Sequence, residues 1–133
     1  MIIDFANRFS TLQAATDATG ASTNVIDLTK AGDAVKDSDL YAVVREGTAL
    51  ASSGLGATLK IALQTAITEA FSTPIELVAV SIAEALLTAN TIVFKVKVPP
   101  GVKQYLRFYY TESGEAFTAG TIDAFLTPDV NIQ

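Results

Sequence analysis

Residues 104–111 read Gln-Tyr-Leu-Arg-Phe-Tyr-Tyr-Thr, and they lie between Pro99-Pro100-Gly101 and the polar run that begins at Glu112. In an extended chain, successive side chains point to opposite faces. Leu106, Phe108 and Tyr110 therefore share one face, and Tyr105, Arg107 and Tyr109 share the other. Because Pro and Gly punctuate the chain on either side, the pattern predicts one strand with its first face in a hydrophobic core.

The same alternation recurs along the chain. It is clearest over 57–65, where Leu59, Ile61 and Leu63 alternate with more polar residues. Strands are expected over 24–28, 40–45, 57–65, 75–80, 90–98, 105–111 and 121–126. Seven or eight short strands separated by Gly, Pro, Ser and Asp turns predict an all-β fold. We expect an antiparallel sandwich of the jelly-roll or Greek-key type.

Two segments depart from this pattern. Residues 1–20 are expected to form an N-terminal arm, in which Phe5, Phe9 and Leu12 would share a face if the arm were helical. The arm would dock on the body or on a neighbour, and 21–133 would form a single β-sandwich domain. Residues 80–89 are rich in Ala and Leu and suit a helical turn by propensity, but we expect a strand to Val80 and then a turn.

Composition narrows the possible partners. Half of the 133 residues are hydrophobic and 17% are charged, so the core is ample and the surface must be rich in Ala, Thr and Ser. A weakly charged surface protects a free monomer poorly, and burial in an assembly explains it. The net charge is −5 without a basic cluster, which argues against nucleic acid as a partner. The longest apolar stretch is too short to span a bilayer, and we expect no membrane partner.

The usual catalytic constellations are missing from the sequence. The chain has no His and no Cys, which excludes Ser-His-Asp and Cys-His catalysis in their usual form. A carboxylate-pair glycosidase remains a third hypothesis, although the glutamates fall mostly in predicted loops. Asp33, Asp37 and Asp39 could suggest calcium, but their spacing matches no calcium loop. We predict no enzyme activity, no cofactor and no metal.

Six short segments of the sequence are informative because of the order in which they occur. They are Ser22-Thr23-Asn24-Val25-Ile26-Asp27-Leu28, Leu63-Gln64-Thr65, Glu69-Ala70-Phe71-Ser72-Thr73-Pro74, Val98-Pro99-Pro100-Gly101, Tyr105-Leu106-Arg107 and Phe117-Thr118-Ala119-Gly120. In this order they resemble the small capsid cement, or decoration, proteins of tailed bacteriophages. The resemblance covers most of the chain from Asn24 onward.

This resemblance implies a jelly-roll-like structural protein on the outside of a phage capsid, assembled in the host cytoplasm. It would stabilise the shell by bridging subunits of a major capsid protein of the common tailed-phage fold. Symmetry favours a self-complementary dimer at two-fold positions, with a trimer at three-fold positions as the rival.

The resemblance marks no interface residue, and our candidates come from the sequence. They are Phe5, Arg8 and Phe9 in the arm, and Tyr105, Arg107 and Tyr109 on the more exposed face of their strand. The alternative function is a carbohydrate-binding sandwich module on a virion surface, which would use the tyrosines of that strand.

Overall fold

The computed structural model describes residues 8–14, 20–27, 41–54, 56–99 and 102–127. These residues form strands and one short 3-10 turn, which confirms the all-β prediction. The strands are β1 (Arg8–Ala14), β2 (Gly20–Ala21), β3 (Ile26–Asp27), β4 (Tyr41–Glu46), β5 (Ala51–Ser52), β6 (Thr58–Ala66), β7 (Ile75–Ala83), β8 (Ile92–Lys97), β9 (Tyr105–Ser113), β10 (Phe117–Ala119) and β11 (Thr121–Thr127). The 3-10 turn, Glu84–Leu86, follows β7.

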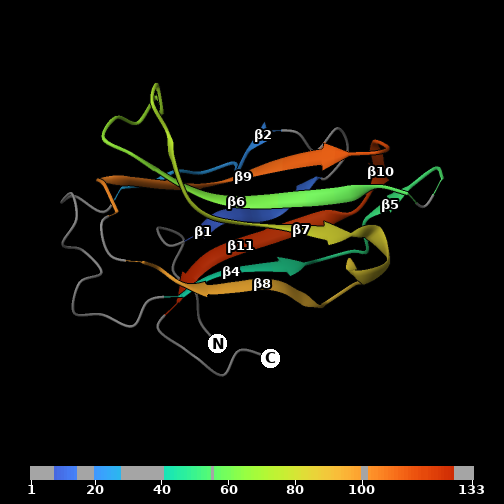
Figure 1. Ribbon diagram of the computed structural model, residues 1–133. Helices are drawn as coiled ribbons and strands as arrows, with labels where there is room; N and C mark the ends of the chain where they lie inside the picture. The colour runs from blue at the N-terminus through green and yellow to red at the C-terminus, as the bar shows by residue number, and fades with distance from the viewer. Residues whose placement is uncertain (1–7, 15–19, 28–40, 55, 100–101, 128–133) are drawn as a thin grey trace.

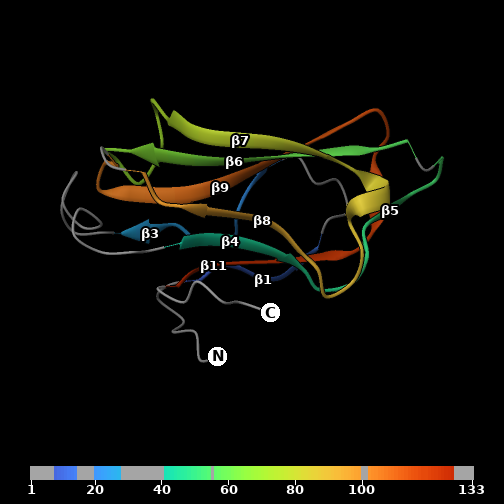
Figure 2. The same ribbon diagram turned by 60° about the horizontal axis from the view of Figure 1, so that its bottom comes forward.

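The strands form two antiparallel sheets that pack face to face (Figures 1 and 2). The first sheet has the order β1-β11-β4-β8. The second has the order β2-β9-β6-β7, and β3 also pairs with β9. A small ladder of β5 and β10 lies at one end of the sandwich.

The pairing follows a jelly-roll path. The first strand, β1, pairs with the last, β11; β2 and β3 pair with β9; β4 pairs with β8; and β6 pairs with β7. Strands therefore pair from the outside of the sequence inward, as in one long hairpin rolled into two sheets. The two sheets contain eight strands when β2 and β3 are counted as one interrupted strand and the separate β5–β10 ladder is left out. This architecture confirms the predicted fold.

The core lies between the sheets and contains the predicted faces. Leu59, Ile61 and Leu63 of β6 are fully buried, as are Leu106 and Phe108 of β9. At its centre the rings of Phe9 and Phe108 meet edge to face, with centroids 4.8 Å apart. The period-two pattern was therefore a reliable guide to the buried side of both strands.

The arm expected over 1–20 is in part a strand of the sandwich. Residues 8–14 form β1 and pair with β11, so the helical alternative is wrong for them. The backbone carbonyl of Phe9 also accepts a hydrogen bond of 2.8 Å from the Asn24 N–H, which joins β1 to the start of the second sheet. Phe5 and the three aspartates Asp33, Asp37 and Asp39 lie outside the described residues.

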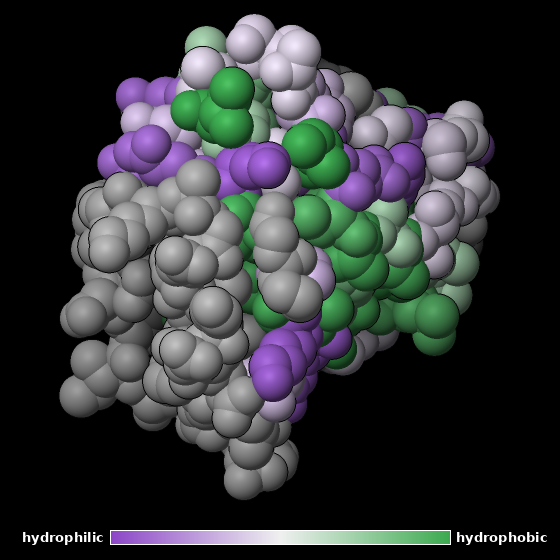
Figure 3. All heavy atoms as spheres, turned by 60° about the vertical axis from the view of Figure 1, so that its left-hand side comes forward, coloured by the Kyte–Doolittle hydropathy of each residue, from purple (hydrophilic) through white to green (hydrophobic). Residues whose placement is uncertain are grey.

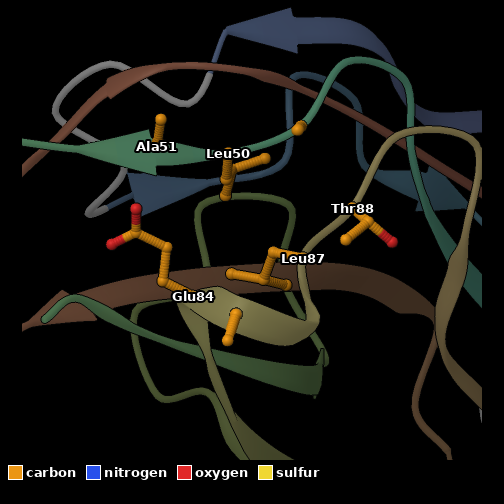
Figure 4. A pocket seen from close by; sticks show the side chains of 7 residues that line it. Leu50, Ala51, Glu84, Leu87 and Thr88 are labelled. Carbon is orange, nitrogen blue, oxygen red and sulfur yellow. The ribbon is translucent and has the colours of Figure 1, made fainter. Parts of the chain in front are cut away.

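Strand β7 is longer than predicted, because it continues to Ala83 before the 3-10 turn begins. Glu84 holds this turn against β5 (Figure 4). Its carboxylate accepts hydrogen bonds from the Ser52 N–H at 2.9 Å, from the Ser52 hydroxyl and from the Ala57 N–H at 3.3 Å. These bonds stabilise the charged form and lower the pKa of Glu84.

Candidate interaction surface

The structure describes five of the six sequence-predicted interface residues, all but Phe5, and it separates them. Tyr105, Arg107 and Tyr109 lie together on the outer face of β9, each half-buried, as predicted. Arg8 is on β1 in the other sheet, where its Nη1 donates to the Thr11 hydroxyl at 3.4 Å. Phe9 is fully buried in the core, so the expectation that it contacts a partner is wrong.

Arg107 is the centre of a compact cluster on the outer face of the second sheet. Its Nε donates to the Gln64 side-chain oxygen at 2.9 Å. The guanidinium carbon lies 4.1 Å from the centroid of the Phe71 ring and 5.3 Å from that of Tyr109. We call Gln64, Phe71, Arg107 and Tyr109 the Arg107 cluster. Two aromatic rings and one hydrogen bond hold the guanidinium in a defined orientation.

Strand register and a strained loop residue bring the cluster together. Gln64 is the direct cross-strand partner of Arg107, and the small Ala62 lies opposite Tyr109. Small and polar residues on β6 leave room for the larger side chains of β9 on this face. Phe71 comes from the β6–β7 connection, where its φ of 51° lies in the left-handed region. A bulky residue in that conformation is strained, so its ring contact with Arg107 helps to stabilise the loop.

The cluster presents a positive charge. Burial lowers the pKa of Arg107, yet a guanidinium stays protonated at any physiological pH. No ion pair links Arg107 to a carboxylate of the described residues; the ion pair nearby joins Lys60 and Glu76 at 3.4 Å. A half-buried, oriented cation flanked by aromatic rings is the residue combination found at binding hot spots.

A second surface is apolar and follows the seam where β7 and β8 face each other at the borders of the two sheets. Leu77, Val78 and Val80 of β7 and Val93, Phe94 and Val96 of β8 are partly buried there. Figure 3 shows hydrophobic side chains gathered over this side of the molecule. A groove of about 420 Å³ opens in the seam, lined in part by Ile82, Leu86 and Ile92.

Sequence reasoning missed two members of the Arg107 cluster. Phe71 and Gln64 were not among the interface residues proposed from the sequence. Their spacing from Arg107 in the chain contains no signal of contact, because contact depends on the register of β6 against β9. Gln64, Phe71 and Arg107 each lie in one of the short pieces quoted in the sequence analysis.

No group of three or more metal-ligating side chains occurs in the described part of the chain. Over the same residues, no helix is long and apolar enough to cross a bilayer.

The fold and this surface define a small antiparallel jelly-roll protein with one charged aromatic face and one apolar seam. The chain belongs to the Bbp16 family, whose model matches residues 9–126. Curated proteins include no match to it.

Proposed function

We propose that this protein is a structural component of a tailed-phage virion. It binds the outside of the capsid and stabilises the shell by bridging subunits of the major capsid protein. It is not an enzyme, and it acts as a homo-oligomer, with a dimer favoured over a trimer.

The observation that carries the proposal is the convergence of three separate pieces of sequence. The pieces that contain Gln64, Phe71 and Arg107 are among those that resemble cement proteins; the first two are close together in the chain, and the third lies more than thirty residues further on. In the fold they meet in one cluster on one outer face. A shared structural feature of such proteins would leave this kind of trace, because each piece supplies one member of the cluster.

A second support is the physical suitability of the fold for mechanical work. Internal pressure from packaged DNA stretches the shell, and a rigid body that contacts neighbouring subunits adds interfaces that must break before the shell fails. The two sheets make a stiff body with a continuous core. The Arg107 cluster offers an oriented cation and aromatic area at little entropic cost on binding.

Quantitative mass spectrometry of purified virions tests the proposal. The abundance of the 14.0 kDa chain should be of the same order as that of the major capsid protein. A few copies per particle would indicate a tail or receptor-binding role. Absence from the particle would contradict a structural role in the virion.

The alternative is a carbohydrate-binding module on a virion surface. It is favoured by the half-exposed tyrosines Tyr105 and Tyr109, whose rings could stack on sugars. Specific binding of the purified chain on a glycan array, together with low abundance in particles, would support this alternative over a cement role.

A further inference from the structure

Strand β7 is a border strand of the second sheet. It pairs with β6 on one side and with no described strand on the other, and Figure 2 shows it at the border of its layer. Its nine residues make it as long as the central strands β6 and β9. Proteins usually guard such borders with charge, Pro or shortness, because exposed backbone N–H and C=O groups pair with other chains.

Those protections are absent from most of β7. From Leu77 to Ala83 the strand contains no charged residue, no Pro and no Gly. Its pairing with β6 is regular from Val78 to Ala83, and the register shift lies before Val78. Within the described part of the chain, this segment is therefore a regularly paired, uncharged edge.

Charge decides which partner such an edge accepts. In a two-fold symmetric pair each residue meets a residue of the identical strand, so like charges fall close together and repel. Strand β8, the border of the other sheet, carries the exposed Lys95 and Lys97 and would bring lysines together. The segment 77–83 of β7 brings no charge against its copy.

The exposed apolar residues also favour a second copy. Among the described residues the exposed large hydrophobic side chains are Ile67, Ile75 and Leu86. The last two lie at opposite ends of β7. Ile75 begins the strand and Leu86 lies three residues beyond its end. In an antiparallel pair centred near Val80, Ile75 of one copy approaches the turn that carries Leu86 of the other, once at each end of the pair.

We propose that two copies of this chain associate by antiparallel pairing of their β7 strands across a two-fold axis near Val80. Ala79 then lies opposite Ser81 of the second copy, and Val78 lies opposite Ile82. The two second sheets join into one continuous sheet, and the exposed apolar ends of β7 are covered.

The axis stands perpendicular to the joined sheet, so the outer faces of both copies point the same way. The two Arg107 clusters therefore lie on one face of the dimer. If the cement role holds, on which this last step rests, that face meets two symmetry-related sites of the shell at once and gains avidity.

The proposal is tested with the purified chain by light scattering after size-exclusion chromatography, over a concentration series. The wild type should approach twice the 14.0 kDa of one chain. The double variant Ala79→Lys/Ser81→Lys should be monomeric, because it places lysines against each other at the centre of the pair. Both replaced residues are exposed and alternate with the core-facing positions, so the fold should persist.

Two further samples separate pairing from a general effect of charge. The control Ser113→Lys/Ala116→Lys makes the same types of replacement at two exposed positions, the last residue of β9 and a residue of the turn that follows it. This control should remain dimeric. Mixing the lysine variant with Ala79→Glu/Ser81→Glu should restore a dimer that contains one chain of each kind. Circular dichroism verifies that every variant is folded.

A monomeric wild type throughout the series would overturn the proposal. So would a dimer that the β7 lysines leave intact. These results are independent of the virion measurement, because a chain that is abundant in particles and monomeric in solution contradicts only the β7 pairing. A β7 dimer that is absent from particles contradicts only the cement role.

Discussion

Glu46 is a fully buried carboxyl group at the end of β4. It shares a face of that strand with Ala42 and Val44, which belong to the core. Neither carboxyl oxygen has a hydrogen-bond partner within the described residues. Burial, with a smaller contribution from the negative charge of Asp123, raises the pKa of Glu46 to about 8. The side chain is therefore mostly protonated at neutral pH.

This burial predicts a pH dependence of stability. Between about pH 4.5 and about pH 8 the folded state keeps a proton that the unfolded chain releases, so the contribution of Glu46 to stability falls as pH rises. Glu46→Gln cannot ionise and should escape this loss. Urea unfolding is measured at about pH 5, 7 and 9. The free energy of unfolding of the variant should increase relative to that of the wild type at each step, by about 1.4 kcal/mol for each pH unit at most. A constant difference between the two proteins across this range would contradict the assignment.

Arg107 and Arg8 provide a matched comparison between the two sheets. Arg107→Ala should weaken binding to capsid shells by at least about 2 kcal/mol, or about 30-fold in affinity, because it removes the oriented cation of a hot spot. Its effect on folding stability should be only about 1 kcal/mol. Arg8→Ala should leave binding unchanged, since Arg8 lies on the other sheet. Loss of binding in Arg8→Ala alone, measured by cosedimentation with shells, would place the shell contact on the first sheet.

At the scale of elements, the short connection between β10 and β11 depends on Gly120. Its φ is +120°, and a Cβ there would lie 2.7 Å from the Leu50 Cα and 2.9 Å from the Ala49 carbonyl oxygen. Both atoms belong to the backbone and cannot move aside easily. The glycine therefore permits the close approach of this corner to the segment that precedes β5.

Gly120→Ala should accordingly lower the free energy of unfolding by about 1–3 kcal/mol or more. Gly20→Ala is the control, because a Cβ at Gly20 meets no atom within 4 Å and should change stability by less than about 0.5 kcal/mol. Thermal unfolding of both variants measures the contrast. Equal stability of the two would show that the corner relaxes to accept a side chain.

The long strands could be predicted from the sequence because their burial has a period of two. In β9 the burial alternates strictly from Tyr105 to Tyr110. In β6 the predicted core residues Leu59, Ile61 and Leu63 are buried, although Ala62 and Ala66 on the opposite face are buried as well. Strand β1 could not be predicted in this way, since only Phe9 signals its buried face clearly and its pairing partner lies over a hundred residues away. The two- and three-residue strands β2, β5 and β10 are too short to show any period.

The candidate surface was predictable only in part. The outward face of Tyr105, Arg107 and Tyr109 follows from alternation within one strand. The contribution of Phe71 follows from a loop conformation with positive φ, and the contribution of Gln64 follows from register. Neither property is encoded in local sequence periodicity, so local patterns identify the strand and tertiary pairing determines the cluster.

At the scale of the whole molecule, the β7 edge and the outer face that carries the Arg107 cluster have separate roles in our account. The β7 edge joins two copies of the chain, and the joined outer face presents two Arg107 clusters to the shell. A cement protein needs both properties, because bridging requires at least two contact sites on one rigid body. The low charge of the chain is consistent with large surfaces that are covered in the assembly.

The most direct measurement compares phage particles that lack this protein with the same particles after addition of the purified chain. The temperature at which packaged DNA is released is followed with a DNA-binding dye. We predict that the wild-type chain raises the release temperature, that Arg107→Ala does so less at equal concentration, and that the effect saturates as binding sites fill. If the release temperature is unchanged although the chain is bound at saturation, the protein does not stabilise the shell and the central claim is contradicted.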